Sequence, residues 1–210
     1  MSNNAEPARA ETMRRRDVLT AACAFGAVSA RAQAKPVRVK LVTGKGLIVI
    51  ELYADKAPIT SANFLRYVDT RRYDGATIYR ASSAPGAPEI GLIQGGLQND
   101  PKKLLRPIAH ESTLKTGLKH ADGTVSIARW APGTATSDFF ICIGESSYLD
   151  AAPKAKGDNA GFAAFGQVIE GMDVVHAIHK LPTFATAGVG SMKGQMLKAP
   201  VPIVSARRTT

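Results

Sequence analysis

Residues 124–143 read TVSIARWAPGTATSDFFICI, and this stretch carries most of the information about the fold. Its first part, TVSIAR, predicts a β-strand because it is rich in β-branched residues, and its last part, DFFICI, predicts a second strand. The Gly, Pro, Ser and Thr residues of 131–137 indicate a loop between the two strands. Because side chains alternate along a strand, Phe139 and Phe140 face opposite sides, and we expect one of them in the core.

Short segments of the same kind lie on both sides of this stretch, and turn residues separate them. Apolar spacing also predicts two helices, one that begins at Pro58 and one with Met172, Val175 and Ile178 on a single face. Residues 81–91 (ASSAPGAPEIG) predict a loop. About eight short strands and two helices indicate a sandwich or a barrel, and this pattern does not choose between them. The further segments with strand character are 37–43, 47–52, 76–80, 92–94, 162–168 and 200–207.

The chain is strongly basic, but its charges are scattered. Lys and Arg number 27 against 17 Asp and Glu, which gives a formal net charge of +10 over 210 residues. The basic residues form no long run and have no interleaved aromatic residues, so a solvated surface is favoured and no nucleic acid partner is expected. The length suits one domain with an additional terminal segment.

The first 34 residues have the character of an export signal. Three arginines at 14–16 precede an apolar, small-residue stretch that is about 13 residues long, too short to span a bilayer comfortably. Residues 15–19 (RRDVL) resemble the twin-arginine signal, and an ordinary secretory signal is the alternative. Residues 32–34 (AQA) match an A-x-A cleavage pattern, so we expect cleavage near Ala34. The mature chain is then expected in the periplasm or secreted, without stable membrane association.

Other chemistries find little support in the residues. Removal of the signal leaves Cys142 as the only cysteine, which excludes an intramolecular disulfide, and its apolar neighbours predict a buried thiol. His110 with Glu111, and His176 with His179, lack the H-E-x-x-H spacing or an evident third ligand, so no metal is expected. A serine hydrolase of the G-x-S-x-G type is also unsupported, because the sequence lacks that motif.

Three segments, in this order along the chain, resemble the cyclophilin family. Residues 78–80 (IYR) followed by 94–96 (QGG) are similar to the family's F-H-R…Q-G-G. Residues 126–142 contain SIAR, a threonine and SDFFIC, which is similar to S-M-A-N…T-x-x-S-Q-F-F-I. Residues 148–150 (YLD) with 165–172 (FGQVIEGM) match W-L-D…F-G-x-V-x-x-G-M. Several independent segments in one order make the resemblance specific.

The resemblance implies a fold and an activity for residues 35–210. The fold is mainly β, a closed eight-stranded antiparallel β-barrel capped by two α-helices. The activity is that of a peptidyl-prolyl cis-trans isomerase, which acts on proline-containing polypeptides without a cofactor. We expect a monomer. The alternative is a module that holds proline-containing segments, as a chaperone does, without turnover.

The residues suit a non-covalent mechanism for this activity. The barrier to rotation about an X-Pro bond is ~18–20 kcal/mol because of amide resonance. Twisting the bond localises a lone pair on the prolyl nitrogen, so a fixed cationic donor beside that nitrogen stabilises the transition state preferentially. By resemblance, Arg80 occupies the catalytic arginine position, and its guanidinium is permanently charged. Gln94 is expected to orient Arg80 and to bond the substrate backbone.

The resemblance also implies a pocket for the proline ring and a groove for the peptide. Ligand pockets are mostly apolar with a few placed polar groups. Ala128 and Arg129 are expected to pair their main chain with an extended peptide, which would tolerate many sequences. The apolar residues that the resemblance assigns to the pocket and its rim are Leu92, Phe140, Tyr148, Leu149 and Phe162.

Several positions depart from the family's pattern. Asp138 stands where the family usually has Gln, and its carboxylate could pair with Arg80 or Arg129. Phe162 replaces a His that is common in eukaryotic members and keeps an aromatic wall. Tyr148 replaces a Trp, so the indole N–H donor is absent and we expect weak cyclosporin binding.

Overall fold

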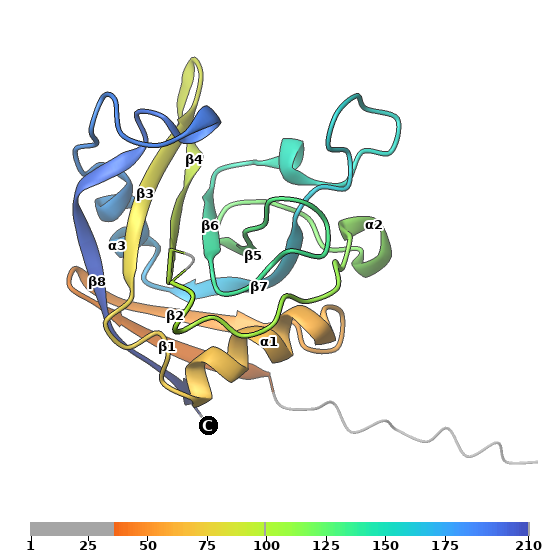
Figure 1. Ribbon diagram of the computed structural model, residues 1–210, viewed down its shortest axis with the longest axis horizontal. Helices are drawn as coiled ribbons and strands as arrows, with labels where there is room; N and C mark the ends of the chain where they lie inside the picture. Colours follow the sequence, from red (N-terminus) through yellow and green to blue (C-terminus); the bar gives the residue numbers. More distant parts are fainter. Residues whose placement is uncertain (1–35, 99, 210) are drawn as a thin grey trace, which may run out of the picture. The chain divides into compact units, whose positions relative to one another are not determined.

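The alternating and β-branched segments form a ring of antiparallel strands that closes on itself (Figure 1). The computed structural model describes residues 36–98 and 100–209, and the expected export signal over 1–34 lies outside them. Within the described residues the barrel order is β1-β2-β7-β5-β6-β4-β3-β8. The expected eight-stranded barrel is therefore confirmed, and the sandwich is excluded. The strands are β1 (Val37–Thr43), β2 (Gly46–Leu52), β3 (Thr77–Ala84), β4 (Ala87–Gly96), β5 (Thr124–Ile127), β6 (Phe139–Ile143), β7 (Ala163–Glu170) and β8 (Met196–Thr209).

The barrel interior is filled by side chains from alternate strand positions. In β1, Val39 and Leu41 are fully buried, whereas Lys40 between them is exposed. Phe139 of β6 belongs to this core and meets Phe64 edge-on, with ring centroids 5.4 Å apart. Phe140 belongs to a separate apolar cluster, so the two phenylalanines face opposite sides as expected.

Helices cover the barrel where the chain crosses between distant strands. Helix α1 (Pro58–Asp69) has proline in its first turn and packs against β7 and β8. Helix α3 (Met172–His179) buries Val175 and Ile178 and packs against β2, β3 and β4. No helix within residues 36–98 and 100–209 combines the length and apolar character that a membrane crossing requires.

The expectation of two helices misses a third, one-turn helix, α2 (Thr113–Thr116). Ser112 caps its start, where the hydroxyl accepts a hydrogen bond from the Leu114 N–H at 3.4 Å. Gly117 ends it with φ of 70°, which glycine adopts without strain. The helix is too short to show apolar periodicity in the sequence, so only its caps could have indicated it. Two 3-10 turns, η1 (Ser147–Leu149) and η2 (Gly190–Met192), complete the described elements.

The expectation of a loop over 81–91 is wrong. Strand β3 runs on to Ala84 and β4 begins at Ala87, so the segment is an extended hairpin that projects from the barrel (Figure 1). Its Gly, Pro and Ser residues supply a tight turn and let the two strands approach closely, instead of forming a loop. A Cβ at Gly91 would lie 2.1 Å from the carbonyl oxygen of Ser82, so only glycine allows the two paired strands to approach this closely.

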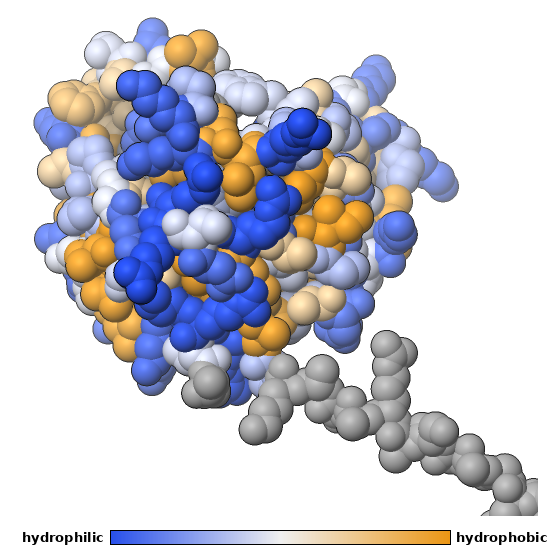
Figure 2. All heavy atoms as spheres, turned by 60° about the horizontal axis from the view of Figure 1, so that its bottom comes forward, coloured by the Kyte–Doolittle hydropathy of each residue, from blue (hydrophilic) through white to orange (hydrophobic). Residues whose placement is uncertain are grey.

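The face of the molecule that carries α1 is largely hydrophilic (Figure 2). Arg66 and Asp69 of α1 are exposed on it. Asp69 accepts hydrogen bonds from Arg208 of β8 at 2.7 and 2.5 Å. This face is therefore solvated and charged, which contrasts with the apolar cavity described next.

Candidate active site

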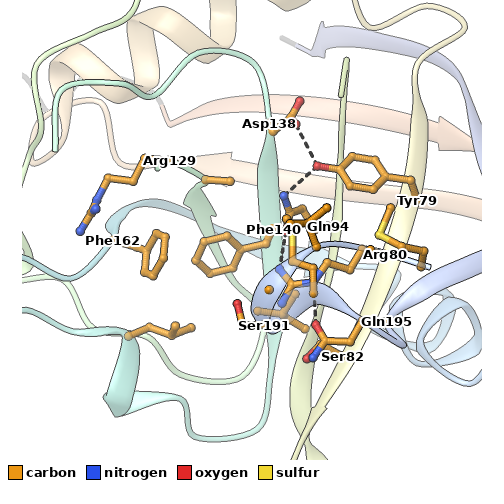
Figure 3. A pocket seen from close by; sticks show the side chains of 18 of the residues that line it. Tyr79, Arg80, Ser82, Gln94, Arg129, Asp138, Phe140, Phe162, Ser191 and Gln195 are labelled. Atoms are coloured by element: carbon orange, nitrogen blue, oxygen red, sulfur yellow. Dashed lines mark hydrogen bonds between the residues drawn. The ribbon is translucent and has the colours of Figure 1, made fainter. Parts of the chain in front are cut away.

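One large cavity opens on the side of the barrel formed by β3, β4 and β6 (Figure 3). Its volume is about 960 Å³, within the range of small-molecule and peptide sites. All of the site residues predicted from the sequence line it, although they come from six separate parts of the chain. They are Arg80, Leu92, Gln94, Ala128, Arg129, Asp138, Phe140, Tyr148, Leu149 and Phe162.

An apolar pocket forms one part of this cavity. Leu92, Phe140 and Leu149 are buried together, with Phe162 packed against them. The rings of Phe140 and Phe162 meet edge-on at a centroid distance of 5.3 Å. Cys142, two positions beyond Phe140 on the same strand face, is fully buried behind the pocket, and burial raises the pKa of its thiol to about 12. The expected buried thiol is confirmed.

Arg80 is held from two sides by amide side chains. Its Nη1 donates to Oε1 of Gln94 at 2.5 Å, and its Nε donates to Oε1 of Gln195 at 2.8 Å. Arg80 and Gln94 are direct partners in the pairing of β3 with β4, which places their side chains next to each other. Burial lowers the pKa of Arg80 from its ordinary value, whereas Tyr79 and Tyr148 nearby raise it.

Asp138 contacts neither Arg80 nor Arg129, so the expected ion pair is wrong. Its Oδ2 accepts a hydrogen bond from the hydroxyl of Tyr79 at 2.8 Å. The side chain of Asp138 is 7% exposed and lines the cavity. Its Oδ1 accepts hydrogen bonds from the N–H groups of Leu97 and Gln98 at 2.8 and 3.1 Å, and from the hydroxyl of Ser137 at 2.9 Å.

Arg129 binds a neighbouring loop with its side chain. Its guanidinium donates to Asp158 at 2.6 and 3.0 Å and to the carbonyl oxygen of Gly161. The same group lies 5.0 Å from the ring centroid of Phe162, a cation–π distance. The hydrogen bonds from Arg129 lower the pKa of Asp158. Arg129 therefore fastens the loop that brings Phe162 into the cavity wall.

The expected peptide edge at Ala128 and Arg129 is only partly free. The N–H of Ala128 donates to the carbonyl oxygen of Asp138 at 2.7 Å. The carbonyl oxygen of Ala128 and the N–H of Arg129 make no hydrogen bond with the described residues 36–98 and 100–209. These two groups remain available to an extended peptide.

Sequence reasoning missed two groups that meet the predicted ones. Tyr79 precedes Arg80 on β3, and alternation would turn the two side chains to opposite faces. The β3–β4 register shifts between Ile78 and Arg80, and this bulge lets both side chains line the cavity. Gln195 comes from the segment before β8, 115 positions beyond Arg80, and no motif signals it. The motif at 78–80 includes Tyr79, but the bulge is not visible in the sequence, so alternation alone points Tyr79 away from Arg80.

A Ser-His-Asp constellation lies behind the pocket, but it cannot reach a substrate. His120 Nδ1 lies 2.8 Å from Oδ1 of Asp150, and its Nε2 lies 2.9 Å from Oγ of Ser126. His120 and Ser126 are both fully buried. A nucleophilic serine must be accessible to its substrate, so we interpret this group as a structural network.

Comparison with known proteins identifies a family that spans most of the chain. The profile of the family described as "Cyclophilin type peptidyl-prolyl cis-trans isomerase/CLD" matches residues 38–208. A peptidyl-prolyl cis-trans isomerase of Acinetobacter baylyi is 36% identical over 181 residues, which cover 86% of this chain and 89% of the relative. Peptidyl-prolyl cis-trans isomerase B of Escherichia coli is 34% identical over 142 residues, which cover 67% of this chain and 83% of the relative.

Solved structures show the same fold. The crystal structure of a Cryptosporidium parvum cyclophilin type peptidyl-prolyl cis-trans isomerase, in the presence of the dipeptide Ala-Pro, matches with a TM-score of 0.65. The match covers 82% of this chain and 99% of that chain at 20% identity. The family profile, the relatives and the fold agree, and the chain belongs to the cyclophilin-type peptidyl-prolyl cis-trans isomerase family.

Proposed function

We propose that this chain accelerates rotation of X-Pro bonds in polypeptides, with Arg80 as the donor to the prolyl nitrogen. One observation carries the proposal: the guanidinium of Arg80, held by Gln94 and Gln195, lines the same cavity as the buried cluster around Phe140. Rotation about an X-Pro bond breaks the amide resonance. A cation that is held in place beside the pocket for the proline ring would stabilise the twisted bond.

Two nitrogens of the Arg80 guanidinium are held by amide side chains, and the third is the proposed donor to the substrate. Nε and Nη1 are engaged by Gln195 and Gln94, whereas Nη2 makes no hydrogen bond within residues 36–98 and 100–209. In a planar X-Pro amide the nitrogen lone pair is delocalised and accepts poorly. As the bond twists, the lone pair localises and the Nη2 donor gains strength, which lowers the barrier without a covalent step. Removal of one such placed donor costs about 10²–10³-fold in rate.

The apolar pocket would hold the proline ring while the chain on one side of it rotates. Phe140 is 3% and Leu149 is 8% exposed, so the pocket offers a closely packed apolar surface. The carbonyl oxygen of Ala128 and the N–H of Arg129 supply main-chain partners for the flanking peptide, and such contacts read no particular side chain. The substrate class is therefore proline-containing polypeptide in extended form.

The test is isomerisation of an Ala-Pro peptide by the full chain, by Arg80→Ala and by the control Arg66→Ala. Arg66 is exposed on α1 and lies outside the cavity lining. We expect the wild type and Arg66→Ala to be equally active and Arg80→Ala to be weaker by ~10²-fold or more. Equal rates for all three would remove Arg80 from the mechanism. Peptide binding without any acceleration would favour a proline-binding chaperone module.

We also propose that the chain is exported, with residues 1–34 as the signal and 35–210 as the isomerase. The support is the sequence pattern at 14–34 alone. Replacement of Arg15 and Arg16 by lysine tests it in a bacterial host. Retention of the full-length chain in the cytoplasm is expected for a twin-arginine signal, and unchanged export would favour the general secretory route. A wild-type chain that stays in the cytoplasm would contradict export.

A further inference from the structure

Two positions at which the chain departs from the family's pattern are bonded to each other. Tyr79 stands where the quoted F-H-R pattern has His, and Asp138 stands where the family usually has Gln. The hydroxyl of Tyr79 donates to Oδ2 of Asp138 at 2.8 Å, and the two residues are 6% and 7% exposed. We propose that Tyr79 and Asp138 are positioning residues that fix the amide of Gln94 and, through it, the guanidinium of Arg80. The proposal rests on the proposed role of Arg80.

The carboxylate of Asp138 is the fixed end of this network. An ionised carboxylate only accepts hydrogen bonds, and here both of its oxygens are occupied. Gly96 packs against it so closely that a Cβ there would lie 2.2 Å from Oδ1 of Asp138. The group can therefore neither rotate nor shift without loss of several contacts. Its partners on the Oδ1 side are Leu97, Gln98 and Ser137.

The carboxylate sets the direction of every hydrogen bond that follows. Because Asp138 cannot donate, the hydroxyl of Tyr79 must donate to it and has lone pairs left to accept. The amide nitrogen of Gln94 donates to that hydroxyl at 2.7 Å, so its amide oxygen turns towards Arg80. If the Gln94 amide were flipped, its NH₂ group would face the guanidinium of Arg80, and two hydrogen-bond donors would oppose each other. Burial, together with the charge of Asp138, raises the pKa of Tyr79, which keeps its proton in place.

The network keeps the negative charge at a distance from the guanidinium. Tyr79 and Gln94 stand between Asp138 and Arg80, and no ion pair joins the two charged residues in the described part of the chain (Figure 3). A direct ion pair would occupy the donors of Arg80 and weaken its pull on the prolyl nitrogen. Asp138 therefore orients the guanidinium without neutralising it.

Asp138→Asn in the full chain tests the direction of the network. The shape of the side chain is kept, but its amide nitrogen would face either the hydroxyl of Tyr79 or the N–H groups of Leu97 and Gln98. In the first case Tyr79 must accept and then donate to Gln94, which turns the NH₂ of Gln94 towards Arg80. We expect kcat to fall by roughly 10–100-fold, the size of effect that a small misplacement of a catalytic group produces. KM should change less than about 3-fold, because the apolar pocket is untouched.

A second substitution separates orientation from simple damage. In Asp138→Asn with Gln94→Glu, the new carboxylate accepts from both Tyr79 and Arg80, and the asparagine donates to Tyr79. The hydrogen bonds again run in one consistent direction, but the new carboxylate also forms an ion pair with Arg80. We therefore expect a partial recovery, with kcat of the double variant above that of Asp138→Asn and below that of the wild type. A purely structural role predicts the opposite, since each change alone removes native contacts.

Tyr79→Phe and Tyr53→Phe form a matched pair in case Asp138→Asn folds poorly. Tyr79→Phe removes the middle link, whereas Tyr53 lies outside the cavity lining. We expect a loss of kcat of roughly 10-fold or more only for Tyr79→Phe, with thermal unfolding checked for both. A folded Tyr79→Phe or Asp138→Asn with the kcat of the wild type would overturn the proposal. An inactive wild type, or an Arg80→Ala variant as active as the wild type, would instead refute the proposed function.

Discussion

His120 and Phe140 stack with their ring centroids 6.0 Å apart and 16° between the ring planes. The ring of Phe140 lines the cavity, and the buried imidazole of His120 packs against it from behind. Asp150 and Ser126 hold that imidazole, and Asp150 directly follows Tyr148 and Leu149 of the pocket wall. This buried group thus joins β5, β6 and η1 behind the apolar pocket.

Stability should fall in acid because His120 is buried. Burial lowers the pKa of His120 below its ordinary 6.5, and Asp150 opposes this in part. Below pH ~6.5 the unfolded chain therefore binds more protons than the folded chain, which favours unfolding as the pH drops. Urea unfolding between pH 5 and 8 should show this loss in the wild type and in His176→Asn, and less of it in His120→Asn. The same pH slope in all three would contradict this role of His120.

Phe139 and Phe140 offer a matched pair of substitutions at adjacent buried positions. Phe139→Leu and Phe140→Leu should each cost about 1–2 kcal/mol of unfolding free energy, below the ~3–5 kcal/mol of a Phe→Ala change. Only Phe140→Leu should lower kcat/KM, by roughly 10-fold or more, because only Phe140 lines the cavity. Equal loss of activity in both variants would show that stability, and not the pocket, limits the rate.

The bond between Arg129 and Asp158 should influence substrate binding more than chemistry. Asp158→Asn weakens a pair whose carboxylate is half exposed, so the loop that carries Phe162 should loosen slightly. We expect KM to rise by roughly 2–5-fold with little change in kcat. Lys154→Ala, in the same exposed stretch but without an ion pair among the described residues, should behave as the wild type. A fall in kcat alone for Asp158→Asn would contradict the proposed role.

Tyr148 should limit cyclosporin binding. The side chain lines the cavity and is 62% exposed, but a tyrosine lacks the indole N–H donor of the family's tryptophan. Tyr148→Trp should tighten binding by about 10-fold, the value of one added hydrogen bond. Calorimetric titration of both proteins measures the difference, and equal affinity would show that other residues, not Tyr148, set it.

The local pattern predicted the strands but not how they close. Alternation of the kind seen at Val39, Lys40 and Leu41 depends on neighbouring residues only, so it is readable in sequence. Barrel closure depends on the pairing of β1 with β8, which are separated by most of the chain. The resemblance supplied that closure, because pattern alone is equally consistent with a sandwich. The hairpin at 81–91 was missed because its composition is typical of a loop, whereas Gly86 serves a tight turn and Gly91 a close approach of the two strands.

The residues that the resemblance names line one cavity, whereas the bonds among them were not predictable. The resemblance assigned Arg80, Gln94 and Phe140 to one site, and the structure brings all three to one cavity. It could not assign the partner of Asp138, since that depends on a bulge that turns Tyr79 inward. Charge alone suggested an arginine partner for Asp138. The structure gives Asp138 neutral donors instead, because other groups already engage both arginines.

The most direct test of the account separates binding from rotation at Arg80. Peptide affinity and the cis–trans exchange rate of a bound Ala-Pro peptide are measured by NMR on one sample each of wild type and Arg80→Ala. If the Nη2 donor acts only on the twisted bond, the exchange rate should fall by ~10²-fold or more while Kd changes less than about 5-fold. An unchanged exchange rate, or a loss confined to Kd, would contradict the central claim.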